Sequence, residues 1–115
     1  MLFQQKYSLR KRIDESKRIL IKYPDRIPII CKHLTIQMKR NKFLVPKDMT
    51  VGELIIIIRS HMDLKKEHAI FMFINNNIIP TNSTLLSEVY CLYKNEDGFL
   101  YVSYSEENAF GAIVF

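Results

Sequence analysis

Few residues of this 115-residue chain have the type and spacing that catalysis or metal binding requires. The histidines His33, His61 and His68 share no metal-ligand spacing. Cys31 and Cys91 lie far apart and form no Cys-x-x-Cys motif, so we expect two reduced thiols. Glycine-rich phosphate loops and the motifs of zinc proteases and serine hydrolases are absent from the sequence. We therefore expect no enzyme activity, no cofactor and no metal.

Phe110 and Gly111 lie near the C-terminus, where they precede the residues AIVF. A glycine in such a tail, taken alone, fits a simple turn. The adjacent Glu106 and Glu107 fall in the same segment, where paired acid and base chemistry would lack rigid support.

The elements that would position these residues begin with a helix predicted over residues 9–22. Leu9, Ile13, Ser16 and Leu20 recur at helical spacing, with Ser8 as N-cap and Pro24 as stop signal. Residues 1–8 show no periodicity and fit either a second short helix or a loose arm. Leu2 and Phe3 in this segment could contact a membrane, or the segment could pack on the domain or be disordered.

Two apolar runs, residues 27–34 and 43–46, predict neighbouring strands. Thr50 and Glu53 form a capping box, which favours a helix over residues 50–62 despite four consecutive isoleucines. That helix leaves Ile56 and Ile57 outside its core stripe, so a second apolar face needs a partner. A strand at 69–76, a short helix at 84–93 capped by Ser83 or Thr84, and a strand at 99–104 complete an α+β chain.

Charge is divided unevenly along a chain long enough for one domain. Residues 1–50 hold 13 basic and 4 acidic side chains (+9), and residues 51–115 hold 4 and 8 (−4), which sums to the net +5. A basic half could face nucleic acid, anionic lipid or acidic peptides. Aromatic residues are not interleaved with the basic ones, so we expect no nucleic acid partner. No window is apolar enough to span a bilayer, and the basic residues follow the first apolar ones, unlike a signal peptide; we expect a cytoplasmic protein.

Four segments carry a resemblance to a known family: YPDRIPIIC, KFLVPKDMTVGELIIIIR, AIFMFINN and DGFLYVSYSEENAFG. In this order and with these gaps, the chain resembles the autophagy-related ubiquitin-like modifiers, the family of the GABA-receptor-associated protein and the microtubule-associated light-chain modifiers. The resemblance implies a ubiquitin-like β-grasp fold with an N-terminal helical extension. It divides the chain into the extension at 1–24, the β-grasp domain at 25–105 and a flexible tail at 106–115.

The resemblance also implies a role as a substrate of other enzymes. A cysteine protease would cleave after Gly111, and activating and conjugating enzymes would join the new carboxylate to phosphatidylethanolamine. The modifier would then move from the cytoplasm to the autophagosome membrane. An alternative is a ubiquitin-like interaction domain that is never conjugated.

The family further implies a groove for extended peptides that carry an aromatic residue and, three positions on, an aliphatic one. The aromatic set, carried over by position, is Glu15, Ile19, Pro28, Ile30, Lys42, Leu44 and Phe99. The aliphatic set is Phe43, Val45, Pro46, Met49, Leu54 and Ile57. The rim residues are Arg26, Lys39, Arg40 and His61.

Several positions depart from the family pattern. The link between the first two strands is short and free of acidic residues, and Lys32 replaces a usual Glu, so we expect a more basic rim that favours acidic peptide flanks. Glu106 stands where the tail commonly has Gly, which affects the flexibility expected there.

Overall fold

The computed structural model describes residues 2–33, 41–61, 70–75 and 77–105. Its elements are α1 (Phe3–Lys6), α2 (Leu9–Lys22), β1 (Arg26–His33), β2 (Lys42–Pro46), α3 (Val51–Ser60), β3 (Phe71–Ile74), α4 (Leu86–Tyr93) and β4 (Leu100–Ser105). The predicted order of helices and strands is confirmed, and residues 3–6 form the short helix that was one of two options for the N-terminus. No helix within the described ranges is both long and apolar enough to cross a membrane.

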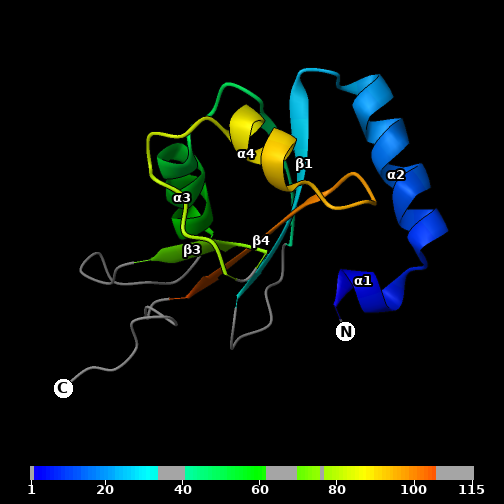
Figure 1. The fold of residues 1–115 in the computed structure, drawn as a ribbon, viewed down its shortest axis with the longest axis horizontal. Coiled ribbons are helices and arrows are strands. Elements are labelled where there is room, and N and C mark those ends of the chain that lie inside the picture. Colours follow the sequence, from blue (N-terminus) through cyan, green and yellow to red (C-terminus); the bar gives the residue numbers. More distant parts are fainter. Residues whose placement is uncertain (1, 34–40, 62–69, 76, 106–115) are drawn as a thin grey trace.

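The four strands form one mixed sheet in the order β2-β1-β4-β3. β1 is antiparallel to β2 and parallel to β4, and β3 is antiparallel to β4. Figure 1 shows α3 and α4 on one face of this sheet and the N-terminal helices on the other. β2 is therefore an edge strand, and the side of it away from β1 pairs with no strand among the residues described.

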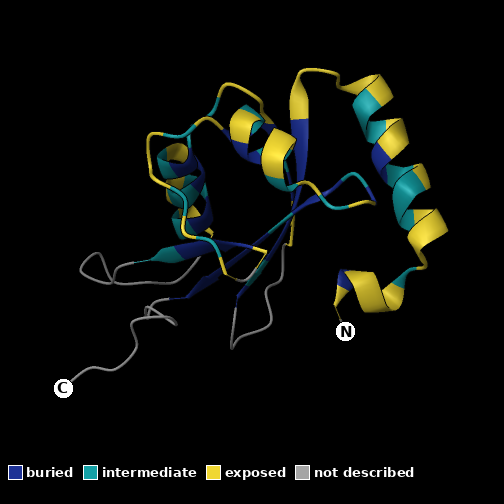
Figure 2. Cartoon of the chain, in the orientation of Figure 1, coloured by how far each residue is buried: buried dark blue, intermediate teal, exposed yellow. Residues whose placement is uncertain are grey.

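The pleat of β1 separates two cores. Ile27, Ile29 and Cys31 point into the larger core with α3 and α4, whereas Ile30 belongs to a smaller one under α1 and α2. Since both faces are covered, β1 is buried over nearly its whole length, as Figure 2 shows. Burial raises the pKa of the Cys31 thiol to about 12, so it is an apolar core residue with no thiolate chemistry at neutral pH.

Two of the three N-caps predicted from the sequence are confirmed. Ser8 Oγ accepts from the N–H of Lys11, and Thr50 with Glu53 forms the predicted capping box. The predicted cap of α4 is wrong, because its N-cap residue is Leu85 and neither Ser83 nor Thr84 caps it. Backbone carbonyls take that role: the N–H groups of residues 86 and 87 donate to the carbonyls of Met49 (2.8 Å) and Lys47 (3.1 Å).

Candidate functional site

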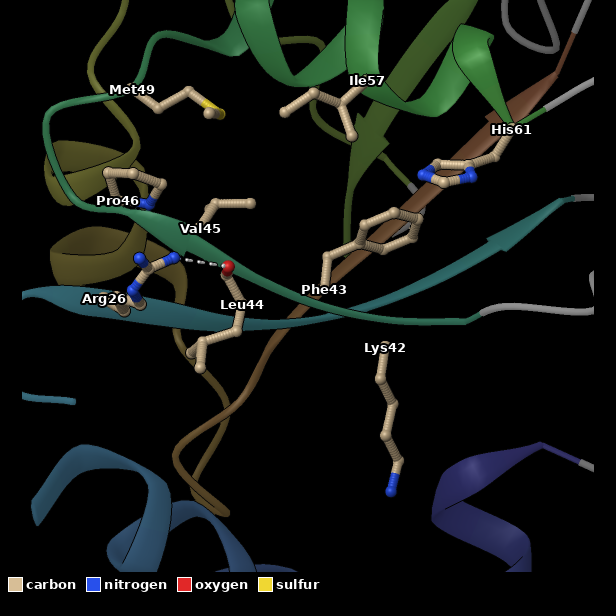
Figure 3. A pocket seen from close by; sticks show the side chains of 9 residues that line it. All are labelled: Arg26, Lys42, Phe43, Leu44, Val45, Pro46, Met49, Ile57 and His61. Atoms are coloured by element: carbon tan, nitrogen blue, oxygen red, sulfur yellow. Dashed lines mark hydrogen bonds between the residues drawn. The ribbon is translucent and has the colours of Figure 1, made fainter. Parts of the chain in front are cut away.

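The candidate site follows the edge strand β2, whose side chains alternate between the two faces of the sheet. Phe43 and Val45 point toward α3 and join the larger core. Lys42 and Leu44 point the other way, toward α2, as Figure 3 shows. A pocket of about 450 Å³ runs along the strand, and its lining residues are Arg26, Lys42, Phe43, Leu44, Val45, Pro46, Met49, Ile57 and His61.

The α3 side of this pocket is apolar. Met49 and Ile57 are partly buried above Phe43 and Val45, and the ring of His61 lies 5.7 Å from that of Phe43. The pocket thus gives Ile57 the apolar surroundings that the second apolar face of α3 needs. Its neighbour Ile56 is 67% exposed and does not line the pocket. The structure brings together five of the six residues in the aliphatic set. Leu54 is the exception.

Leu54 points into the core and has no exposed surface, so it cannot contact a peptide in this pocket. The reason is its position in the helix: Val51, Leu54 and Ile58 form the buried stripe of α3. Ile57 follows one turn after Leu54 but lies to one side of that stripe.

On the α2 side of β2, several residues of the aromatic set are buried against one another. Pro28, Ile30 and Phe99 are all buried and present almost no free surface. Ile19 on α2 is half-buried against the same cluster. Above it, Lys42 Nζ lies 2.8 Å from Glu15 Oε1, an ion pair that bridges β2 and α2. Both partners are partly exposed, so this pair contributes only about 0 to 1 kcal/mol and opens easily.

A buried polar network holds α2 against the sheet beside this cluster. The Asp97 carboxylate accepts from Arg12 Nη1 at 2.6 Å and from the Tyr101 hydroxyl at 2.5 Å. Ser16 Oγ donates to the Asp97 carbonyl at 2.5 Å. Because Arg12 and Ser16 belong to α2 and Asp97 precedes β4, the network sets the distance between α2 and the aromatic set.

The rim is basic on the α2 side. Arg26 Nη1 donates to the Leu44 carbonyl at 3.4 Å, so its charge lies next to the edge of β2. The other predicted rim residues Lys39 and Arg40, and the predicted cleavage site at Phe110 and Gly111, lie outside the described residues. In the described part of the chain no group of three His, Cys, Asp or Glu side chains could hold a metal ion.

Two features of the site were not predicted. Asp97 precedes Gly98, and in the sequence such a pair indicates only a turn. Phe3 lies in the segment for which membrane contact and packing on the domain were both open, but no partner was predicted for it; it is 6% exposed and packs on Phe99 with ring centroids 5.2 Å apart. Only Leu2 of that pair remains exposed. A lone aromatic in a segment without periodicity gives no sequence signal for such a contact.

Comparison with known proteins identifies the family. Residues 11–111 match the family model described as "Autophagy protein Atg8 ubiquitin like". The chain is 45% identical over 115 residues to Autophagy-related protein 8 of Schizosaccharomyces pombe, covering 96% of this chain and 94% of that protein. The chain belongs to the Atg8 family of ubiquitin-like autophagy proteins. It is also 42% identical over 113 residues to Autophagy-related protein 8i of Arabidopsis thaliana, covering 95% of this chain and 97% of that one.

Solved Atg8 structures share the architecture of this Atg8-family chain. Trypanosoma brucei ATG8 superposes with a TM-score of 0.84 at 34% identity, covering 90% of this chain and 91% of that one. Plasmodium falciparum Atg8, solved in complex with a Plasmodium falciparum Atg3 peptide, gives 0.82 at 35% identity, covering 94% and 98%. The predicted ubiquitin-like β-grasp with N-terminal helices is confirmed. The family also makes this chain a ubiquitin-like modifier of autophagy.

Proposed function

We propose that the edge of β2 binds extended peptides as an added strand, with an aromatic and an aliphatic anchor three residues apart. The alternation of β2 carries this proposal. In a strand, residues i and i+3 point to opposite faces of the sheet, roughly 10 Å apart along the chain. The aliphatic set lies on the α3 face of β2 and the aromatic set on the α2 face. An aromatic-x-x-aliphatic peptide beside β2 therefore directs one anchor to each set.

Matched variants on α3 test the groove. Ile57→Ala removes a side chain that lines the pocket, whereas Ile56→Ala removes its exposed neighbour. We expect Ile57→Ala to weaken a Tyr-x-x-Leu peptide about tenfold or more in calorimetric titration, since a buried interface anchor contributes roughly 2 kcal/mol. Ile56→Ala should change the affinity less than twofold. Equal effects of the two changes would contradict the groove.

We further propose that this modifier is itself the substrate in a conjugation pathway and not an enzyme. A processing protease exposes Gly111, activating and conjugating enzymes carry its carboxylate, and phosphatidylethanolamine receives it. The Atg3 peptide bound to the Plasmodium falciparum relative supports a conjugating enzyme among the partners. The protein then passes from the cytoplasm to the autophagosome membrane, where cargo receptors dock in the groove. Division into an extension, a β-grasp domain and a tail at 1–24, 25–105 and 106–115 is part of this proposal.

A change at Gly111 tests the conjugation. Gly111→Ala should abolish processing and phospholipase-sensitive membrane attachment in cells, because a Cβ blocks approach to the carbonyl. The purified variant should keep the affinity of the wild type for the Tyr-x-x-Leu peptide. A Gly111→Ala protein that still becomes linked to lipid would refute the proposal. A wild-type protein whose intact mass in cells retains residues 112–115 would instead support an interaction domain that is never conjugated.

A further inference from the structure

Phe3 is the only residue of α1 that is buried. α1 has four residues, and its N-cap residue is Leu2, whose side chain cannot cap it. A helix this short is not stable alone in water, so its position depends on what Phe3 contacts. Those contacts are the buried Ile30 and Phe99, with Tyr7, Ile19 and Tyr101 packed around them.

The cluster that holds Phe3 shares three residues with the aromatic set: Ile19, Ile30 and Phe99. A bound aromatic side chain needs roughly 150 to 250 Å² of contact. Ile30 is 6% exposed and Phe99 2% exposed, and both share one buried cluster with Phe3, whose ring centroid lies 5.2 Å from that of Phe99. A peptide anchor therefore cannot reach the base of the aromatic set until a covering group moves.

Lys42 lies between α1 and the groove along β2. Its Nζ lies 4.8 Å from the centroid of the Phe3 ring and 5.9 Å from that of Tyr7, while it pairs with Glu15. The cation–π contacts and the ion pair hold Lys42 over the aromatic set. If Lys42 leaves this position, α1 loses a contact that keeps it docked. If α1 is released, Lys42 loses its contacts with the rings of Phe3 and Tyr7.

We propose that Phe3 occupies the place on the aromatic set where the aromatic anchor of a peptide would bind. In this proposal α1 is a latch that the anchor must displace. The inference rests on the groove proposed above and adds its regulation. Docking of α1 and binding of the anchor exclude each other because both use the surface of Ile30 and Phe99. The observed affinity is then the affinity of the open form multiplied by the fraction of molecules in which α1 is undocked.

Phe3→Ala tests the competition, with Leu2→Ala as control on the exposed neighbour. We expect Phe3→Ala to bind a Tyr-x-x-Leu peptide roughly tenfold tighter than the wild type, as for a latch closed in about 90% of molecules. Leu2→Ala should match the wild type. Unchanged or weaker binding by Phe3→Ala would overturn the latch, since Phe3 would then be irrelevant or a wall of the site.

A fluorescence probe follows the latch directly, because the sequence contains no tryptophan. In Phe3→Trp we expect a blue-shifted emission that moves to the red when the Tyr-x-x-Leu peptide saturates the groove. Leu2→Trp should emit at the solvent value throughout. An emission from Phe3→Trp that already equals that of Leu2→Trp, or that does not move while calorimetry records binding, would overturn the latch and leave the groove standing. If neither the wild type nor Phe3→Ala binds the peptide, the groove fails and the latch with it.

Discussion

Asp97 is the acidic side chain on which the position of α2 depends. It is 1% exposed, and besides Arg12 and Tyr101 it accepts from the N–H of Phe99 at 2.9 Å. A carboxylate with this many donors is satisfied in the interior, but each donor loses its partner if the carboxylate is removed. The energetic cost is largest at Arg12, because its side chain is only 11% exposed and remains charged.

We expect Asp97→Ala to lower the free energy of unfolding by about 3 to 5 kcal/mol, the usual effect of leaving a buried charge unpaired. Asp14→Ala is the matched control, since the exposed Asp14 pairs with Arg10 at 3.5 Å on the outer face of α2. It should change stability by less than about 1 kcal/mol. Urea unfolding of both variants measures the difference. Similar losses would show that the Asp97 network does not hold α2.

At the scale of elements, the turn before β4 and helix α2 fit together at a glycine. Gly98 has φ +89°, a conformation that side chains disfavour, and a Cβ there would lie 2.4 Å from Ser16 Oγ. The Gly98 carbonyl also accepts from the Tyr90 hydroxyl at 2.7 Å, so the turn is held from α4 as well. Backbone conformation and close approach to α2 therefore both require glycine here.

Gly98→Ala should lower the free energy of unfolding by roughly 1 to 3 kcal/mol, from positive-φ strain and the displaced Ser16. Gly52→Ala provides the comparison. A Cβ on Gly52 would lie 3.3 Å from Asn82, and the helix propensity gained inside α3, about 1 kcal/mol, offsets that crowding. Thermal unfolding should place Gly52→Ala near the wild type and Gly98→Ala well below it. The reverse order would contradict this account of the turn.

At the scale of the whole molecule, two half-buried tyrosines make stability fall in alkali. Burial, and then the hydrogen bond to Asp97, raise the pKa of Tyr101; burial and the charge of Asp97 raise the pKa of Tyr90. The folded protein keeps these protons after the unfolded chain, with a tyrosine pKa of about 10, has lost them. The stabilisation is complete below about pH 10 and is lost as the pH rises toward the folded pKa values.

The urea midpoint should therefore decline above about pH 10. Tyr101→Phe should start from a lower midpoint at neutral pH, because the hydrogen bond to Asp97 is lost, and should decline less steeply. Tyr23→Phe, at a tyrosine that is 39% exposed, is the control and should leave the slope unchanged. Parallel curves for the wild type and Tyr101→Phe would contradict the assignment of this dependence to Tyr101.

The sequence by itself determined the local structure and the family. Helical spacing and the caps at Ser8 and Thr50 define α2 and α3, because those signals depend only on neighbours along the chain. The cap of α4 could not be predicted in the same way. Its first N–H groups are satisfied by carbonyls of residues 47–49, which only the folded chain brings near. Family positions pointed to five residues that line the pocket along β2, whereas the sixth, Leu54, faces the core.

Only the tertiary structure decided which side chains cover the aromatic set. Phe3 and Phe99 are 96 positions apart, and the Arg12 and Asp97 side chains 85, so no local pattern connects them. Their contacts exist because α1 and α2 pack on the sheet face opposite α3. Sequence periodicity shows that a helix has a buried face, but the partner of that face is chosen by burial of apolar surface and satisfaction of charge across the whole fold.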